Sequence, residues 1–141
     1  MNLIPTRVHG ILDYIHGPSL LAAPDVLQTK DSSSARLVSR LVGGGQTAYT
    51  LMTDFELGAV KAIPMRTHLI LDIASGAFLA VAPWLFGYSK EGTRYWLPHA
   101  LVGAMEVLVA TMSKDEPSYY KPRPVTEGVK KGIKAWLKLK T

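Results

Sequence analysis

The chain of 141 residues contains no cysteine, which excludes disulfides, thiolate metal sites and cysteine nucleophiles. Long uncharged apolar stretches are also scarce, since only residues 73–87 form one, and it is shorter than the roughly 18 residues expected of a clear membrane span. Strand patterns are weak throughout. The first ten residues lack a basic stretch followed by an apolar run and a cleavage site, so we expect no signal peptide.

Motifs of common enzyme classes are absent as well. The run Gly43-Gly44-Gly45 is not followed by the Lys-Ser or Lys-Thr pair of a phosphate-binding loop. Neither a Gly-x-Ser-x-Gly elbow nor a His-Glu-x-x-His pair occurs. We therefore predict a protein that is not an enzyme, with no catalytic residues and no metal site.

Net charge is missing from most of the chain. Residues 1–113 hold eight basic and eight acidic side chains, whereas residues 114–141 hold eight basic and three acidic ones. A nucleic-acid-binding domain normally carries its positive charge along the folded surface. A neutral, apolar body with a basic extension is more typical of a membrane protein with a cytoplasmic tail, and we expect no nucleic-acid partner.

What the chain does contain is an internal duplication. The segment IPTRVHGILDYIHGPSLLAAP at 4–24 returns 59 positions later as IPMRTHLILDIASGAFLAVAP at 63–83, with 11 of 21 residues identical. A weaker repetition follows at a spacing of 60, where Leu-Val-Gly at 41–43 recurs at 101–103. The units are therefore about 55 to 60 residues long.

Each unit predicts a helical hairpin. The expected helices cover about 4–24, 34–54, 63–83 and 96–113, and a helix of about 20 residues spans the roughly 30 Å core of a bilayer. The predicted fold is all-α: a four-helix transmembrane bundle of two tandem hairpin repeats over 1–116, with repeat one at about 4–58 and repeat two at about 63–116. The basic tail, 117–141, contains a short amphipathic helix at 127–140.

A soluble four-helix bundle remains an alternative, because the expected helices contain ionisable residues. Two features favour the membrane. The helices are poor in the Glu and Lys that cover a soluble bundle and rich in small residues four positions apart, such as Gly76 and Ala80, which let helices approach closely in lipid. Aromatic residues, among them Trp84 and Trp96, cluster around the second hairpin turn, as expected at a water–lipid boundary.

The repeat pattern resembles a known family. An opening Ile-Pro-x-Arg-x-His, a following Leu-Asp and a closing Ala82-Pro83-Trp84 resemble the SPW-repeat family of small bacterial integral membrane proteins. That resemblance implies two transmembrane helices per repeat and covers about residues 3–113, but it implies no reaction. In the first copy the motif reads Ala23-Pro24-Asp25, so the interfacial tryptophan is missing and this turn is expected to meet water or a partner protein.

Both copies carry the same polar stripe. His9, Asp13 and Gly17 are spaced four apart on one helix face, and so are His68, Asp72 and Gly76. Because each unit crosses twice, the copies run in the same direction, which predicts the two His-Asp pairs at equal depth. We predict a structural polar cluster in which histidine donates to aspartate and arginine binds a carboxylate, made of Arg7, His9, Asp13, Arg66, His68 and Asp72.

Two alternatives stay open for this cluster. His9 and His68 are candidate ligands of a heme or chlorophyll-type pigment, with aspartate behind them, although no cofactor is the first expectation. A small proton or ion path through the acidic and histidine groups is the other. His16 and His99 have serine at the matching positions and are expected to be satisfied polar groups or interfacial residues.

The predicted role is therefore a structural or accessory component of the bacterial inner membrane, multi-pass, with both termini cytoplasmic. Its expected partners are the lipid bilayer and a larger membrane protein complex, engaged through the tail and the first hairpin turn. The candidate interface residues are Trp84, Trp96, Lys130, Lys131, Lys134 and Trp136.

Overall fold

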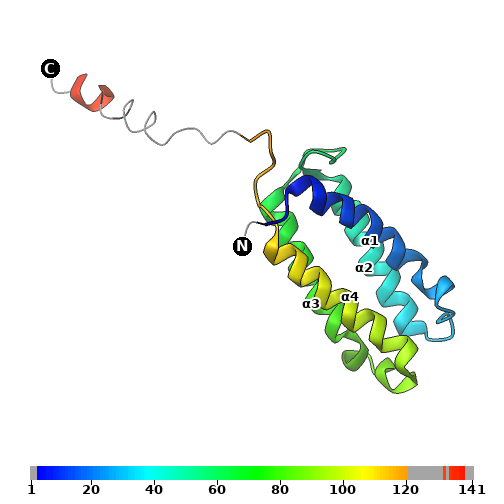
Figure 1. The fold of residues 1–141 in the computed structure, drawn as a ribbon. Coiled ribbons are helices and arrows are strands. Elements are labelled where there is room, and N and C mark those ends of the chain that lie inside the picture. Colours follow the sequence, from blue (N-terminus) through cyan, green and yellow to red (C-terminus); the bar gives the residue numbers. More distant parts are fainter. Residues whose placement is uncertain (1–2, 121–131, 133, 139–141) are drawn as a thin grey trace.

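The structure, a computed structural model, describes residues 3–120, 132 and 134–138, and the expected all-α class is confirmed. Four long helices lie side by side along one direction and form the helical body (Figure 1). They are α1 (Thr6–Val26), α2 (Ser33–Leu51), α3 (Met65–Leu85) and α4 (Thr93–Met112), and a short 3₁₀ helix η1 (Tyr88–Glu91) precedes α4.

The helix ends follow from local chemistry. Pro5 and Pro64, both extended, stand immediately before α1 and α3, where a missing N–H costs no hydrogen bond. Ser32 caps α2, and its hydroxyl accepts a hydrogen bond from the Ala35 backbone N–H at 3.3 Å. Pro24 and Pro83 lie inside their helices, since α1 and α3 each continue for two residues beyond the proline.

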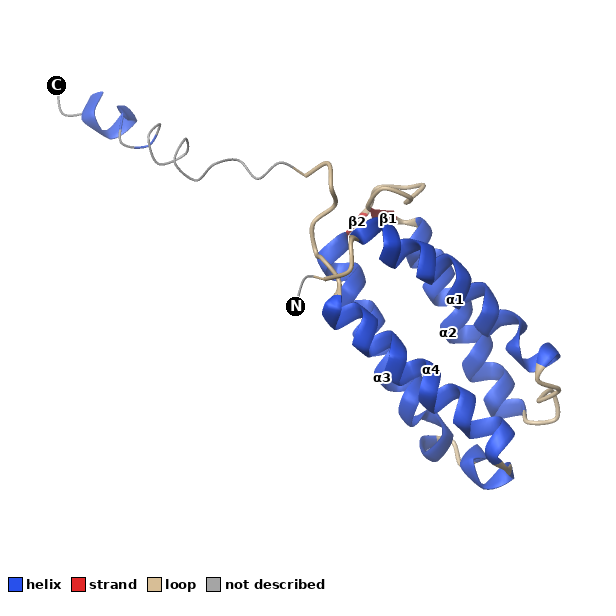
Figure 2. Cartoon of the chain, in the orientation of Figure 1, coloured by secondary structure: helices blue, strands red, loops and turns tan. Residues whose placement is uncertain are grey.

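Two short parallel pairings close the body at one end. The strand β1 (Thr53–Asp54), after α2, pairs with β2 (Ile63–Pro64), before α3 (Figure 2). An isolated parallel bridge joins Ile4, before α1, to Ser113, after α4. Since the repeats are offset by 59 to 60 positions, this bridge is the repeat equivalent of the β1–β2 pairing. Each hairpin therefore leaves its second helix beside the start of the other hairpin.

Glycines set the spacing within each hairpin. A Cβ built on Gly43 of α2 would lie 2.6 Å from the carbonyl oxygen of Gly17 on α1. A Cβ on Gly103 of α4 would lie 2.4 Å from the carbonyl oxygen of Gly76 on α3. The two contacts are equivalent in the repeats. Both hairpins therefore pack backbone against backbone at a point where no side chain fits.

The helical body buries several ionisable side chains and exposes many large apolar ones. His9, Asp13, His68 and Asp72 are at most 4 % exposed. Many large apolar side chains on all four long helices point outward, and the following are at least 60 % exposed: Ile15, Leu41, Ile70, Leu101 and Met105. A water-soluble bundle rarely exposes so many large apolar side chains, although this body also has a buried apolar core that includes Leu20, Val42 and Leu79.

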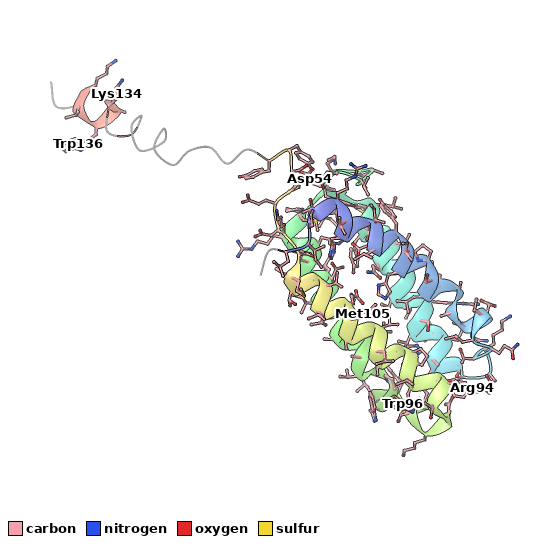
Figure 3. The ribbon with its side chains drawn as sticks, in the orientation of Figure 1. Asp54, Arg94, Trp96, Met105, Lys134 and Trp136 are labelled. Carbon is pink, nitrogen blue, oxygen red and sulfur yellow. The ribbon has the colours of Figure 1, made fainter. Side chains whose placement is uncertain are left out.

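Two of the helices in the described part of the chain, α3 and α4, are long and apolar enough to cross a membrane by length and composition. At the far end of the second hairpin, the exposed ring of Trp84 lies 5.5 Å from that of Trp96 between centroids. Figure 3 shows Trp96 and Arg94 at this end and Asp54 at the opposite end. Such aromatic pairs are typical of the interfacial level of a membrane protein.

The predicted tail helix at 127–140 falls largely outside the described residues, as do Lys130 and Lys131. Residues 134–138 are helical, and Lys134 and Trp136 lie exposed on this segment (Figure 3).

Candidate functional site: a buried histidine–aspartate cluster

The structure brings together one histidine and one aspartate from each repeat. His9 and Asp13 lie one turn apart on α1, and His68 and Asp72 lie one turn apart on α3. The spacing of four residues puts each pair on one helix face, and the parallel direction of α1 and α3 puts the two pairs at the same height. We call these four residues the His–Asp cluster.

Four atoms of the His–Asp cluster converge on one point. The Nε2 atom of His9 lies 2.9 Å from Oδ2 of Asp72 and 3.2 Å from Oδ2 of Asp13. The Nε2 atom of His68 mirrors this arrangement, at 2.9 Å from Asp13 and 3.2 Å from Asp72. The two Nε2 atoms are 3.3 Å apart. Each imidazole therefore contacts the carboxylates of both repeats, which ties α1 to α3.

The outer nitrogens of the imidazoles are held by hydroxyl groups. His9 Nδ1 lies 2.8 Å from Oγ of Ser113, and His68 Nδ1 lies 2.8 Å from Oγ1 of Thr53, its repeat equivalent. Both hydroxyls donate their own proton to a backbone carbonyl one turn earlier, Ser113 to Val109 and Thr53 to Tyr49. Each hydroxyl must therefore accept from the imidazole, so both Nδ1 atoms carry a proton.

The outer oxygens of the carboxylates are held as well, by two side chains of α2. Tyr49 donates its hydroxyl to Oδ1 of Asp72 at 2.7 Å, and Gln46 donates its amide to Oδ1 of Asp13 at 3.5 Å. The Oδ2 atoms are thereby left to face the centre. Sequence patterns did not single out these supporting residues, because Tyr49 and Gln46 are not repeated at 109 and 106.

Arg7 and Arg66 do not join the cluster, contrary to the sequence prediction. Both are exposed, and within residues 3–120 no ion pair links either of them to a carboxylate. The reason is angular: each arginine precedes its histidine by two positions, which is about 200° around a helix. The nitrogen atoms that face Asp13 and Asp72 inside the cluster belong to His9 and His68, not to the arginines.

The two sides of the cluster differ. Between α2 and α3, the Tyr49 side chain fills the space beside Asp72. Its repeat equivalent is Val109, and on that side a cavity of about 260 Å³ opens between α1 and α4. Its wall includes His9, Asp13 and Glu106, and an apolar rim that includes Met105, which Figure 3 places on α4. The two repeats are therefore similar in sequence, but the cavity reaches the His–Asp cluster from the side of α1 and α4.

Polar groups continue along this cavity. Glu106 accepts a hydrogen bond from Ser75 through Oε1 at 2.6 Å, while its buried Oε2 has no partner among the described residues. His16 also lines the cavity, and its buried Nε2 has no hydrogen-bond partner in the same part of the chain. A second cavity of about 140 Å³ shares His16, Ser19 and Val102 with the first.

A second polar link between the hairpins lies toward the other end. His99 Nδ1 donates to the Tyr95 carbonyl at 2.7 Å, and His99 Nε2 lies 2.8 Å from the hydroxyl of Ser39. Since Nδ1 holds the proton, Ser39 donates to Nε2. This histidine is satisfied by a serine from the other repeat, as expected.

The first hairpin turn carries charge where the second carries tryptophan. Asp25 stands at the position equivalent to Trp84, and its carboxylate pairs with Lys30 at 2.7 Å and with Arg40 at 3.2 Å. All three groups are exposed. This turn therefore matches an aqueous or protein environment better than lipid tails.

Glu56, in the loop between β1 and β2, ties this loop to the start of α1. Partial burial raises its pKa, but hydrogen bonds from the Ser118 backbone N–H at 2.7 Å and the Thr6 hydroxyl at 2.7 Å outweigh burial and bring the pKa to about 2, from 4.5. A lowered folded-state pKa stabilises the fold above about pH 4.5, and this contribution is lost as the pH falls toward 2.

We therefore expect Glu56→Gln to flatten the dependence of the melting temperature on pH between 4.5 and 2. The measurement is thermal unfolding followed by circular dichroism across this pH range. Glu116→Gln is the matched control, because Glu116 is the repeat equivalent of Glu56 and is exposed. Equal slopes for wild type and Glu56→Gln would contradict the assignment.

The shape of the His–Asp cluster also bears on the heme alternative. The two imidazoles do face one point, as axial ligation of a heme requires. Their Nε2 atoms are only 3.3 Å apart, however, and both carboxylates approach within 3.2 Å of them. A flat macrocycle between the rings would have to displace Asp13 and Asp72. The geometry favours protons or a small ion at the centre.

The sequence model of the SPW repeat domain matches residues 7–113, which contain the whole His–Asp cluster and both hairpins. No curated protein and no solved structure matches the chain.

Proposed function

Because the chain belongs to the SPW repeat family, we propose that it is an integral membrane protein whose four long helices all cross the bilayer and whose role is structural or accessory rather than catalytic. The single observation that supports this proposal most strongly is that the helical body exposes many large apolar side chains and buries ionisable ones. The four ionisable groups of the His–Asp cluster are buried, and large apolar side chains are exposed on every long helix.

Helix dimensions support four crossings. The long helices contain 21, 19, 21 and 20 residues, and at about 1.5 Å per residue each spans roughly the 30 Å of a hydrocarbon core. By composition alone, α3 and α4 are apolar enough to cross a membrane. All four long helices bury polar side chains, among them Asp13, Thr50, Asp72 and Glu106. In lipid, polar side chains of this kind are stable when they face one another inside the body.

The His–Asp cluster supports the accessory role because it links the two hairpins. Without water-driven burial of apolar surface, membrane helices associate through close packing and polar contacts. Here the glycine contacts join α1 to α2 and α3 to α4, and the cluster joins the two hairpins. We propose that it acts as a clamp holding both hairpins at a fixed angle, so that their outer faces form one surface for lipid or a larger membrane complex.

For orientation, we propose the bacterial inner membrane with both termini in the cytoplasm. The basic tail adds positive charge to the cytoplasmic side, where basic residues are normally in excess. Lys134 and Trp136 are both exposed on the described tail segment, and a segment that carries cations and an aromatic ring suits an anionic lipid surface. The charged first turn, with Asp25 and Arg40, faces the other side.

Single cysteines can test the four crossings directly, since the chain has none of its own. We expect Leu41→Cys and Leu101→Cys, at positions 65 % and 61 % exposed, to resist a water-soluble maleimide in intact membranes because lipid covers them. Gln28→Cys and Ala59→Cys, in exposed loops at opposite ends, serve as matched controls. Each should react when the reagent has access to its side of the membrane.

Extraction of the membranes with alkaline carbonate completes the test, because an integral protein stays in the pellet. The proposal would be overturned if the protein appeared in the soluble fraction and Leu41→Cys and Leu101→Cys reacted as fast as the loop cysteines. Labelling at Leu41 but not at Leu101 would leave only the second hairpin in the bilayer, and would equally contradict four crossings.

A further inference from the structure

We propose that the His–Asp cluster is a binding site for one divalent transition-metal ion of the zinc class, held by Nε2 of His9 and His68 and by one oxygen each of Asp13 and Asp72. This inference deepens the proposed function and rests on it, because the ion would be the chemical basis of the clamp between the hairpins. It also revises the expectation from sequence that no metal site exists.

Charge balance is the first argument. The four groups lie together at no more than 4 % exposure, and the two carboxylates carry two negative charges when ionised. The hydroxyls of Ser113 and Thr53 assign a proton to each Nδ1, which leaves two Nε2 lone pairs facing the carboxylate oxygens. Acceptors facing acceptors in a buried site are strongly unfavourable. Two positive charges remove this repulsion, and one divalent ion provides both, as would a proton on each Nε2.

Geometry is the second argument. A tetrahedral zinc ion with bonds of about 2.0 Å has ligand atoms separated by about 3.3 Å. The four nitrogen–oxygen separations in the His–Asp cluster are 2.9, 2.9, 3.2 and 3.2 Å, and the nitrogen–nitrogen separation is 3.3 Å. All four ligand atoms lie within 4.8 Å of one another. A tetrahedral ion would fit once the nitrogen–oxygen separations widened by a few tenths of an ångström and the two carboxylate oxygens lay about 3.3 Å apart.

The supporting contacts are the third argument. Metal-bound histidine normally donates its other N–H to an oxygen, and bound carboxylates normally accept hydrogen bonds at their second oxygen. Here Ser113 and Thr53 receive the Nδ1 protons. Tyr49 and Gln46 hold the outer oxygens of Asp72 and Asp13. The outward atoms of all four ligands are therefore occupied, and the inward atoms are oriented as a metal site requires.

Access is the fourth argument. The cavity between α1 and α4 reaches His9 and Asp13, and the adjoining cavity continues to Thr29 and to the exposed Arg94 at the far end of the body. The unpartnered buried oxygen of Glu106 belongs to a residue that lines the first cavity. A carboxylate beside this route is a suitable intermediate ligand for an incoming cation.

The test is metal content and metal binding of the full chain in mild detergent, purified without a polyhistidine tag. After treatment with a chelator, zinc chloride is titrated in, and bound zinc is counted by mass spectrometry of the elements. We expect one zinc per chain, a higher melting temperature with zinc than without it, and a visible absorption band of tetrahedral cobalt when Co²⁺ replaces zinc. The double variant His9→Ala/His68→Ala should lose all three.

Because that variant removes two buried side chains, Thr53→Val and Ser113→Ala provide a milder comparison. Each keeps all four ligands but removes one oxygen that receives an Nδ1 proton, and we expect zinc affinity to fall about 10- to 100-fold. His99→Ala is the matched control, because His99 is equally buried but bonded to Ser39 elsewhere. It should keep one zinc per chain.

The proposal would be overturned if the wild type bound no zinc, or if His9→Ala/His68→Ala bound as much as the wild type. Zinc-free protein that still resists alkaline carbonate would leave the membrane proposal standing and show that two protons, one on each Nε2, supply the charge. Protein that binds zinc but appears in the soluble fraction would contradict the membrane proposal and leave the zinc site standing.

Discussion

Asp72→Ala should lower the free energy of unfolding by about 3–5 kcal/mol, the usual result of removing one partner from a buried ionic group. Asp72 faces His9 and His68 through Oδ2 and accepts the Tyr49 hydroxyl through Oδ1, so three buried groups lose a contact at once. For a chain of this size the melting temperature should fall on the order of 10 °C. Circular dichroism in detergent during heating measures this change.

Asp115→Ala is the control for this variant. Asp115 is exposed in the segment after α4, so its removal should change the melting temperature by no more than a degree or two. If Asp72→Ala unfolded at the same temperature as wild type, the cluster would contribute no net stability. The clamp between the hairpins would then have to be abandoned.

The second large effect is expected from Gly103→Leu. A Cβ at this position would lie 2.4 Å from the Gly76 carbonyl oxygen and 2.5 Å from the Ala80 nitrogen, and both are backbone atoms that cannot turn aside. The helices α3 and α4 must separate to accept the side chain. Overpacking of this kind costs about 1–3 kcal/mol, and we expect the upper end because the contact is between backbones.

Gly45→Leu is the matched control for Gly103→Leu. Gly45 lies within α2, and a Cβ there would meet no atom within 4 Å. Leucine is also a better helix former than glycine, by roughly 0.5–1 kcal/mol, so this variant should unfold at or above the wild-type temperature. A fall of equal size in both variants would show that added bulk, rather than the contact between α3 and α4, is responsible. The same thermal unfolding measurement decides between the two.

Much of the architecture could be predicted from the sequence, because the duplication shows each structural feature in two copies. The spacing of 59 residues assigns His9 and His68 to equivalent places, and in the structure their Nε2 atoms are 3.3 Å apart. Helix type followed from length, from the prolines before α1 and α3, and from the family pattern. Helix ends were less accurate: α4 begins at Thr93, three residues before the expected start, because Gly92 precedes it in a conformation that favours glycine.

The residues that complete the site could not be read from the sequence in the same way. Ser113 and Thr53 differ in type, although they occupy equivalent positions, and their roles depend on hydrogen bonds to His9 and His68 across 104 and 15 residues. Tyr49 has no counterpart at position 109. Arg7 was assigned to the cluster because its charge suits a carboxylate, but charge carries no information about which side of a helix a residue occupies.

The equivalence of the β1–β2 pairing and the Ile4–Ser113 bridge also bears on how such a chain arises. A single hairpin supplies only one histidine and one aspartate, so a half-length ancestor could complete the cluster only as a homodimer. Its assembly would depend on concentration, whereas fusion of two copies removes that dependence. Fusion also releases each half from the symmetry of a dimer. Differences such as Tyr49 against Val109, and Asp25 against Trp84, are possible only in the fused chain, which has one closed flank and one open flank.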